Sequence, residues 1–376
     1  MSNLVVGVPA EIKNTENRVA VQPDGVAELV YHGQQVLVEA GAGLGSRCTD
    51  EEYAAAGAVI VAGADEVFER ADLIVKVKEP IPAEYHRFRS GQQLFTYLHL
   101  AADRELTEFL LERKIDSIAY ETVQTSDGKL PLLTPMSEVA GRMSVQAAAH
   151  ALESTVGGAG ILLGGVPGTP AARVTILGGG ISGTEAAKMA VGMRAVVRVL
   201  DPDPKRLAYL SDVFGGALDL VMPNRANLAA YVAESDVVIG AVLVPGAKAP
   251  KLVSREMIAS MRPGSVAVDI SIDQGGCFET SRPTTHSDPT YVEEGVVHYC
   301  VANIPGAVAR TSTYALTAAT LPYLVRVAGQ GILGSAAADP ALALGLSTID
   351  GALVNSAVAE AHGLAYRDPA ELLAAG

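Results

Sequence analysis

The segment from residue 173 to residue 201, RVTILGGGISGTEAAKMAVGMRAVVRVLD, determines what kind of fold this chain can adopt. An apolar, β-branched run at 173–177 comes first, and three glycines follow it at the spacing G-x-G-x-x-G. Residues 185–193 then have the composition of a helix, and a second apolar run at 195–200 ends in Asp201. This order predicts a strand, a glycine turn, a helix and a second strand, as in dinucleotide-binding units.

Each glycine of this turn has its own physical task. Gly178 permits the tight turn, Gly180 lets backbone amides approach a pyrophosphate, and Gly183 allows the helix to pack closely on the strand. The free N–H groups at the start of the helix then face the phosphates. Asp201 is placed to bond the adenosine ribose and to repel a 2′-phosphate, so we expect NAD rather than NADP. The alternative is an ordinary tight turn, which such glycines also make.

The length and composition of the chain favour two domains. Of its 376 residues, 49% are hydrophobic and 19% are charged, which is enough apolar material for buried parallel sheets. The formal net charge of −14 argues against a nucleic-acid partner, because phosphate binding needs a basic surface. A net charge of this size suits a soluble protein.

The cysteines and the N-terminus indicate a cytoplasmic protein. Cys48, Cys277 and Cys300 lie far apart, without the spacing of metal ligands, so we expect reduced thiols and no metal site. The N-terminal residues lack the pattern of a secretory signal, and no uninterrupted apolar stretch is long enough to cross a membrane.

Short apolar runs alternate with helical patterns along the chain, which predicts parallel sheets covered on both faces. Thr49 and Glu52 form an expected capping box at one helix start. In the first region we expect strands at 4–8, 35–39, 58–61, 73–77, 94–98 and 117–120, and helices at 23–32 and 49–56. In the second we expect helices at 204–214 and 225–233 and a six-stranded sheet that includes 219–222, 237–241, 266–270 and, last, 296–301.

Two long helices are expected to connect the two domains. One begins at Thr134-Pro135 and runs to about Thr155, and the other begins near Pro305. A loop or hairpin at 157–168 leads into the nucleotide strand, and residues 335–376 have the pattern of short helices. The expected fold class is α/β, with two doubly wound Rossmann-like domains of which the first is discontinuous.

Several polar residues are expected where strands of the first region end. Ligands of open parallel sheets bind at the carboxyl edge of the strands. Lys76 and Lys78 lie two apart at the end of one expected strand, and Tyr97 and His99 lie two apart at the end of another. Arg18 follows the first strand. These side chains are the candidates for substrate chemistry.

Long, irregular and polar stretches carry a resemblance to a known family. They are GVPAEIKNTENRVA, LIVKVKEP, FTYLHLA, SIAYETVQ, PMSEVAGRMSVQ, IGAVLVPGAKAPKLVS, VAVDISIDQGGCFETSRPTTH and TSTYALTAATLPY, and they span the chain almost end to end. The chain resembles the alanine dehydrogenase family, which also contains the NAD-binding subunit of proton-translocating transhydrogenase. The resemblance implies oxidation of L-alanine by NAD to pyruvate and ammonium, the reverse reaction, and a homohexamer.

The resemblance also implies a domain plan and residue roles. Residues 1–133 and 307–376 would form the substrate domain, and 134–306 the NAD-binding domain. His99 and Asp273 would be the catalytic pair, while Arg18, Lys78 and Asn303 would bind substrate. The implied cofactor site consists of Ser137, Gly178, Gly180, Gly183, Asp201, Arg206, Val242, Leu243 and Ile270.

Oxidative deamination requires proton-transfer groups and fixed cations of this kind. Hydride leaves an α-carbon only when the neutral amine can push electrons into an imine, so a base is needed, and imidazole titrates near neutral pH. Water addition to the imine needs a second proton-transfer group, for which Asp273 and Asp269 are rivals. Fixed cations must hold the carboxylate and carbonyl oxygens. Arg18 could instead only form an ion pair with Glu16 or Glu11.

The chain departs from the family pattern in three places. Ile304 stands where many relatives have methionine, and Arg194 where glycine is common in a turn. Residues 221–227 match poorly, which leaves the adenine side undefined.

Two other functions stay open at this point. One is a hydride-transfer subunit of a transhydrogenase-like complex, and the other is a silent NAD-binding protein. For an enzyme, glyoxylate is a further possible substrate, because one methyl group changes pocket affinity by only about 1–3 kcal/mol.

Overall fold

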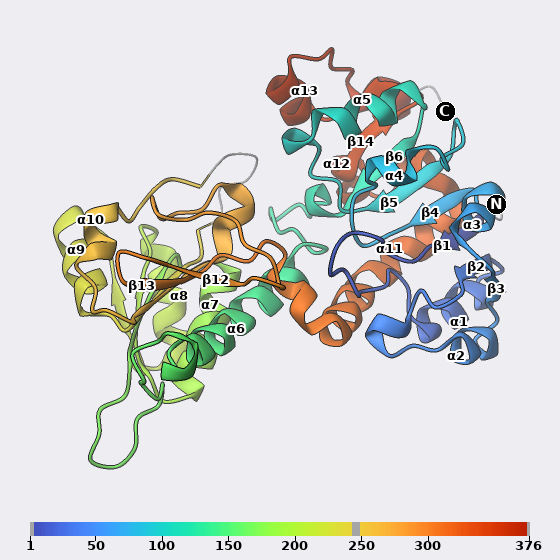
Figure 1. Ribbon diagram of the computed structural model, residues 1–376. Coiled ribbons are helices and arrows are strands. Elements are labelled where there is room, and N and C mark those ends of the chain that lie inside the picture. The colour runs from blue at the N-terminus through green and yellow to red at the C-terminus, as the bar shows by residue number, and fades with distance from the viewer. Residues whose placement is uncertain (1–3, 243–248, 374–376) are drawn as a thin grey trace. The chain divides into compact units, whose positions relative to one another are not determined.

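The computed structural model describes residues 4–242 and 249–373, and the chain forms two compact units (Figure 1). Unit 1 comprises Met1–Met136 and Val308–Gly376, and unit 2 comprises Ser137–Ala307. The chain enters unit 2 in the first turn of helix α6 (Thr134–Ala151). This helix ends at Ala151 rather than near Thr155, because Glu153 has extended backbone angles that no helix can include.

Unit 1 is built on an eight-stranded sheet in the order β15-β14-β6-β5-β4-β1-β2-β3. Six strands pair in parallel, and β14 and β15 are added antiparallel at one end. The strands are β1 (Val5–Val8), β2 (Gln35–Glu39), β3 (Val59–Val61), β4 (Leu73–Val75), β5 (Gln93–Thr96), β6 (Asp116–Ala119), β14 (Leu346–Ile349) and β15 (Ala352–Leu353).

The helices of unit 1 follow the expected alternation. The Thr49 hydroxyl accepts a hydrogen bond from the Glu52 amide, and the Glu52 carboxylate accepts one from the Thr49 amide, so the capping box is confirmed. The 30-residue helix α11 contains a kink at Gly331, where the side chain of Gln93 bonds the next amide. The helices are α1 (Pro23–Tyr31), α2 (Asp50–Ala55), α3 (Ala64–Arg70), α4 (Pro82–Tyr85), α5 (Arg104–Glu112), α11 (Ala309–Ala338), α12 (Pro340–Gly345), α13 (Ser356–His362) and α14 (Pro369–Leu373).

The expectation of only short helices after residue 335 is wrong. Strands β14 and β15 form a hairpin that extends the sheet of unit 1. Its two-residue turn is Asp350-Gly351, and both residues have positive φ (42° and 79°), as a type I′ turn requires. The dipeptide Asp-Gly is a strong hairpin signal, but the flanking strands are short. Because β14 is buried on both faces, its sequence lacks the alternation of apolar and polar residues that would identify it as a strand.

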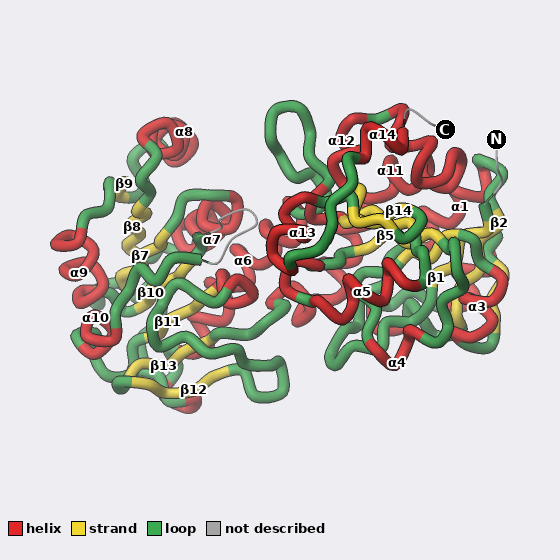
Figure 2. The backbone as a smooth tube through the Cα atoms, turned by 90° about the horizontal axis from the view of Figure 1, so that it is seen from above, coloured by secondary structure: helices red, strands yellow, loops and turns green. Residues whose placement is uncertain are grey.

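Unit 2 is built on a seven-stranded sheet in the order β12-β13-β11-β10-β7-β8-β9. Figure 2 shows this sheet with α6 and α7 on one face and α9 and α10 on the other. The strands are β7 (Arg173–Leu177), β8 (Val196–Leu200), β9 (Asp219–Val221), β10 (Val237–Gly240), β11 (Val266–Asp269), β12 (Thr290–Glu293) and β13 (Val296–Tyr299). The remaining helices are α7 (Ile181–Gly192), α8 (Pro204–Phe214), α9 (Arg225–Glu234) and α10 (Arg255–Ala259).

The sheet of unit 2 has seven strands, one more than the six expected from the sequence. Strand β12 pairs antiparallel with β13 through a turn at Glu294-Gly295, where both residues have positive φ (52° and 77°). Glutamate rarely adopts this conformation, so the turn is hard to recognise from sequence. Arg194 also has positive φ (65°) in the turn before β8, a conformation that favours glycine.

Both sheets have a topological switch point, and the predicted α/β class with two doubly wound units is confirmed. In unit 2 the strands leave β7 in one direction through β8 and in the other through β10. In unit 1 the strands leave β1 through β2 and through β4 in the same way. Ligands bind beyond the carboxyl ends of strands at such a point.

Candidate active site

The glycine turn of unit 2 lies between β7 and α7. A side chain at Gly178, where φ is 97°, would put its Cβ 2.6 Å from the Ala241 carbonyl oxygen at the end of β10. A Cβ at Gly183 would lie 1.8 Å from the Gly178 carbonyl oxygen, so only glycine lets α7 approach the turn. At Gly180 nothing lies within 4 Å of such an atom. The turn is therefore tight where it packs and open where a phosphate would bind.

Asp201 follows β8 and forms hydrogen bonds that stabilise the glycine turn after β7. Its carboxylate accepts hydrogen bonds from the Gly179 amide (2.7 Å) and the Asp203 amide (2.8 Å). A carboxylate has about four lone-pair positions, so acceptor capacity is left for ribose hydroxyls. This geometry fits a nucleotide with a free 2′-hydroxyl.

Arg206 from α8 is also attached to the turn. Its guanidinium donates to the carbonyl oxygens of Gly179 and Gly180 and to Thr184 Oγ1 (2.6 Å). It also lies over the ring of Tyr209, 4.7 Å from the centroid. The N–H donors of Arg206 thus form hydrogen bonds within the protein, which disfavours hydrogen bonds from them to a 2′-phosphate.

Three other expected cofactor residues lie near this edge of unit 2. The Ser137 carbonyl accepts from Ser182 Oγ (2.9 Å), which joins the first turn of α6 to α7. The Val242 amide and carbonyl both bond Ser271 Oγ, and half-buried Ile270 packs against the core. Leu243 lies outside the described residues.

The two rival aspartates of unit 2 have different surroundings. Asp269 ends β11, is fully buried, and accepts from the Ser271 and Cys277 amides and from Ser281 Oγ. Burial raises the pKa of Asp269, and these hydrogen bonds oppose the rise. Asp273 is exposed on the 3₁₀ helix η5 (Ile270–Gln274). Asp273 can therefore meet a ligand, whereas the Asp269 carboxylate is enclosed.

Asn303 of unit 2 has a left-handed backbone conformation. Its φ is 67°, and its carbonyl oxygen accepts from the Gly306 amide (2.9 Å) and lies 3.0 Å from His286 Nε2. A Cβ at Gly306 would lie 2.8 Å from Asn303 Nδ2, so the glycine leaves room for the amide. Asparagine adopts this left-handed conformation more readily than most residues do.

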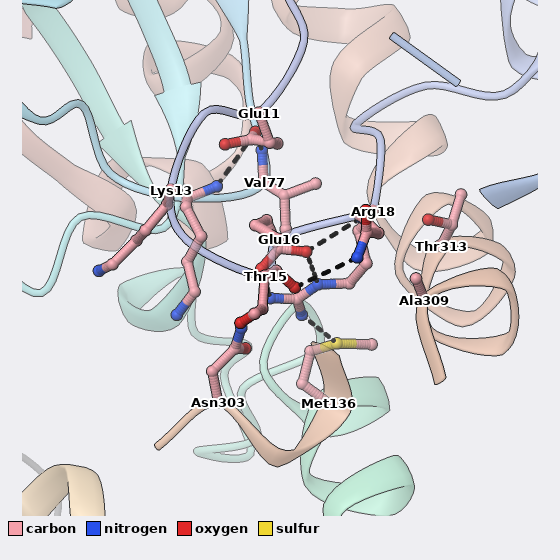
Figure 3. A network of polar contacts seen from close by, with 12 residues as sticks. Glu11, Lys13, Thr15, Glu16, Arg18, Val77, Met136, Asn303, Ala309 and Thr313 are labelled. Atoms are coloured by element: carbon pink, nitrogen blue, oxygen red, sulfur yellow. Dashed lines mark hydrogen bonds and ion pairs between the residues drawn. The ribbon is translucent and has the colours of Figure 1, made fainter. Parts of the chain in front are cut away.

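Arg18 of unit 1 lies in a buried network after β1 (Figure 3). Its guanidinium Nε donates to Glu16 Oε1 (2.7 Å), and Nη1 lies 3.1 Å from Met136 Sδ. Arg18 is only 2% exposed. Burial opposes the charge, but the hydrogen bonds and charge of Glu16 raise the pKa of Arg18. The expected alternative ion pair with Glu16 therefore exists, and it holds the guanidinium charged and oriented.

The two lysines after β4 have different environments, and both lie beyond the strand rather than in it. Lys76 is 1% exposed, and its Nζ bonds Glu11 (3.1 Å) and Glu84 (2.8 Å), which makes it structural rather than solvated. Lys78 is half-buried, and its backbone is fixed because its amide bonds Glu11 and its carbonyl accepts from Thr96 Oγ1 (3.1 Å). Of the two, Lys78 has the accessible ammonium group.

His99 follows β5 in the left-handed conformation, with φ of 50°. Its ring is stacked on that of Tyr97, with centroids 5.9 Å apart and planes 5° apart. Glu121, which follows β6, accepts from the His99 amide (2.6 Å) and lies 3.9 Å from His99 Nδ1. Tyr97 is buried and donates to the Leu132 carbonyl (2.6 Å). The imidazole is thus oriented on one side and 49% exposed on the other.

Sequence reasoning anticipated Glu16 beside Arg18, but it missed Glu121 beside His99 and the pairing of Glu11 with Lys76. Glu121 bonds His99, Glu16 bonds Arg18, and Glu11 bonds Lys76. Glu11 and Glu16 lie in the segment that connects β1 to α1, and Glu121 lies two residues after β6. Their position after a strand was the available signal.

Neither a metal cluster nor a membrane-spanning helix is found in the part of the chain that the structure describes. No group of at least three His, Cys, Asp or Glu residues there could hold a metal ion. Within 4–242 and 249–373, no helix combines the length and apolar character needed to cross a bilayer.

The fold and these two sites define a class of protein. One unit has the turn of a dinucleotide-binding unit, and the other gathers an arginine, a lysine and an oriented histidine at its carboxyl edge. This combination is typical of nucleotide-dependent oxidoreductases with a small anionic substrate.

The chain belongs to the alanine dehydrogenase/PNT family. Residues 7–140 match the family's N-terminal domain, and residues 144–356 match its C-terminal domain. A relative named alanine dehydrogenase from Methanococcus maripaludis is 58% identical over 98% of this chain and 99% of its own length. One of the same name from Mycolicibacterium smegmatis is 53% identical over 99% of this chain and 100% of its own.

Two solved structures resemble the whole chain. A structure named L-alanine dehydrogenase has a TM-score of 0.93 and 51% identity, covering 96% of this chain and 99% of that one. A transhydrogenase from Sinorhizobium meliloti has a TM-score of 0.79 and 27% identity, covering 94% and 99%. The family resemblance expected from the polar stretches is confirmed, and the transhydrogenase is the more distant of these two.

Proposed function

We propose that this protein catalyses the NAD-dependent oxidative deamination of L-alanine to pyruvate and ammonium, and the reverse reductive amination. The observation that carries this is identity of 58% and 53% to relatives named alanine dehydrogenase over nearly the full length of each chain. The enzyme is an NAD-dependent oxidoreductase that acts on an amino group. The alternative, a hydride-transfer subunit of a transhydrogenase-like complex, has the weaker support of 27% identity to a transhydrogenase.

The cofactor is held by residues of unit 2, which we assign as the NAD-binding domain. Gly178, Gly180 and Gly183 fit a pyrophosphate, because two of these positions exclude a side chain and the third is open. Asp201 fits the ribose. Ser137, Arg206, Val242, Ile270 and Leu243 complete the proposed site. When bound, NAD accepts the hydride from the α-carbon of the substrate.

Unit 1 is assigned as the substrate domain, and Arg18 and Lys78 bind the carboxylate and carbonyl oxygens there. The Arg18–Glu16 pair is electrically neutral overall, so Arg18 acts mainly through directed N–H donors, and Lys78 supplies the net positive charge. Asn303, which belongs to unit 2, is a further proposed substrate-binding residue. Fixed cations replace the hydration of the carboxylate and stabilise the oxyanion that forms when water adds to the imine.

His99 acts as the general base. It removes a proton from the substrate, so that the amine lone pair can form the imine as hydride leaves, and it returns the proton in the reverse reaction. Glu121 holds the backbone of His99 through the His99 amide, and its carboxylate lies 3.9 Å from Nδ1 on one side of the ring. Asp273 serves as the second proton-transfer group, for water addition and release of ammonia.

The assembly and location follow from the family resemblance. We propose a homohexamer in the cytoplasm. On the loop before β7, Leu162 is 65% exposed and Val166 is 55% exposed, and a neighbouring subunit would remove such apolar surface from water.

The test is the formation of products from L-alanine. With NAD, the protein should produce NADH, pyruvate and ammonium in equal amounts, and NADP should be a poor substitute. Glyoxylate should also be aminated in the reverse reaction, more slowly than pyruvate. If NADH is bound but L-alanine, pyruvate and glyoxylate give no turnover, the hydride-transfer subunit becomes the better assignment.

A further inference from the structure

Asp269 is a fully buried carboxylate that the proposed mechanism does not use. Its Oδ1 accepts from the Ser271 amide (3.0 Å), and its Oδ2 accepts from the Cys277 amide (2.9 Å) and Ser281 Oγ (2.5 Å). The Phe278 amide lies 3.4 Å from Oδ2. A buried carboxylate with this many donors forms strong, directed hydrogen bonds and fixes the backbone that donates them.

The donors lie on both sides of Asp273. Ser271 precedes it on η5, while Cys277 and Phe278 follow it after the Gly275-Gly276 turn. Gly276 has φ of 74°, and a Cβ there would lie 2.6 Å from Asp269 Oδ2. A side chain at Gly276 would therefore push the loop off the carboxylate. Asp269 closes the loop 270–278 at both ends, with Asp273 between them.

Ser271 extends this network to the neighbouring strand. Its Oγ donates to the Val242 carbonyl (2.7 Å) and accepts from the Val242 amide (3.0 Å). Val242 follows β10 and lies beside the glycine turn, because a Cβ at Gly178 would be 3.4 Å from Val242 Cγ2. The same carboxylate thus fixes the loop of Asp273 and, through Ser271, a residue of the proposed cofactor site.

We propose that Asp269 is a positioning residue that acts through Asp273, holding the loop 270–278 in the geometry that proton transfer requires. The inference rests on the proposed role of Asp273 in the reaction. Asp269 does not touch substrate, because its carboxylate is enclosed by its own donors. A displacement of the loop of about 1 Å lowers a rate by about 100-fold, so a fixed loop matters for turnover.

The experiment is a double-mutant cycle on kcat for reductive amination, with Asp269→Asn and Asp273→Asn alone and combined. Asp269→Asn would set an amide N–H₂ group against backbone N–H donors, so the loop should shift. We expect Asp269→Asn to lower kcat about 100-fold at saturating NADH, a condition under which weaker cofactor binding near Val242 does not affect the measured rate. In the Asp273→Asn background the same change should lower kcat less than about twofold, because both act through one residue.

Two further variants separate positioning from stability. Asp236→Asn is the matched control, since Asp236 is also buried and accepts the Arg173 amide (2.8 Å), but it precedes β10 at the opposite edge of the sheet. It should lower Tm and leave kcat near the parent value. Ser281→Ala keeps the Asp269 carboxylate and removes one donor. Ser281→Ala should lower kcat less than Asp269→Asn does, and this loss should also disappear in the Asp273→Asn background. If Asp269→Asn does not fold, Ser281→Ala tests the same proposal.

The outcomes are distinct. Loss of the Asp269 or Ser281 effect in the Asp273→Asn background supports the proposal. An equal fold-loss in both backgrounds, or a kcat loss of the same size in Asp236→Asn, contradicts positioning but leaves the role of Asp273 intact. If Asp273→Asn alone leaves kcat unchanged, the proposed role of Asp273 is wrong, and the positioning inference is wrong with it.

Discussion

The two units share a strand order but stabilise their carboxyl edges differently. In both, the strands leave a central strand in two directions, through β8 and β10 in unit 2 and through β2 and β4 in unit 1. After β7, unit 2 has a turn in which glycines bring backbone atoms together. After β1, unit 1 has the loop with Glu11, Glu16 and Arg18, where buried ion pairs fix the backbone.

This difference explains how one topology serves two ligands. A pyrophosphate is bound by backbone amides, which require a turn without side chains. A small carboxylate requires directed side-chain cations, and these must be held in place by carboxylates when they are buried. The fold supplies the edge, and the residues after each strand determine what binds there.

The largest expected effect separates structural from functional charge in unit 1. Lys76→Met should destabilise the protein by about 3–5 kcal/mol, because it leaves the buried carboxylates of Glu11 and Glu84 without their cation. Lys78→Met should change stability by less than about 0.5 kcal/mol and raise the KM for pyruvate. Urea unfolding measures the change in stability, and steady-state kinetics measure the KM for pyruvate. Equal stability losses would remove the distinction between the lysines.

The next effect tests the glycine turn of unit 2. Gly183→Ala should cost about 1–3 kcal/mol and weaken NADH binding, because its Cβ has no room beside the Gly178 carbonyl. Gly192→Ala is the control at the end of the same helix, where nothing lies within 4 Å of the added atom. Fluorescence titration with NADH and thermal unfolding give the comparison. Similar NADH affinities in the two variants would contradict the close-packing argument.

A smaller effect tests the choice of nucleotide. Asp201→Ala should reduce the preference for NAD over NADP by about tenfold, since it removes ribose bonding and repulsion of a 2′-phosphate. The measurement is the ratio of kcat/KM values for the two cofactors. An unchanged ratio would show that Asp201 only stabilises the turn through Gly179.

The smallest expected effect is on the pH dependence of stability and comes from His298 of unit 2. Burial favours the neutral form of this histidine, whereas Arg18 and Lys76 of unit 1 are buried as charged groups. His298 is buried and stacked on Tyr291 (5.0 Å), and burial lowers the pKa of His298 below 6.5. The unfolded chain then binds this proton more readily, so stability should fall as pH falls below about 6.5. His298→Gln should flatten the dependence of Tm on pH between about 5 and 7. A slope equal to that of the parent would exclude His298 as its source.

The sequence was most informative where backbone chemistry sets the structure. The glycine spacing around Gly178 and the acid at Asp201 predict strand, turn, helix and strand, because few residues allow that geometry. It was less informative where partners come from distant segments. Lys76 and Lys78 differ because Glu84 and Glu11 pair with the ammonium group of Lys76, and Glu121, which follows another strand, bonds His99. Such pairings depend on the three-dimensional register of the sheet.

The most direct test of the proposed function is ammonium-dependent oxidation of NADH in the presence of pyruvate, measured in the parent, His99→Ala and His32→Ala. His32 is the matched control, because it is similarly exposed (45%, against 49% for His99) and is also paired with a glutamate. We predict full activity in the parent and in His32→Ala, none without ammonium, and a loss of at least about 100-fold in His99→Ala. Undiminished ammonium-dependent activity in His99→Ala would contradict the mechanism, and no activity in the parent would contradict the function.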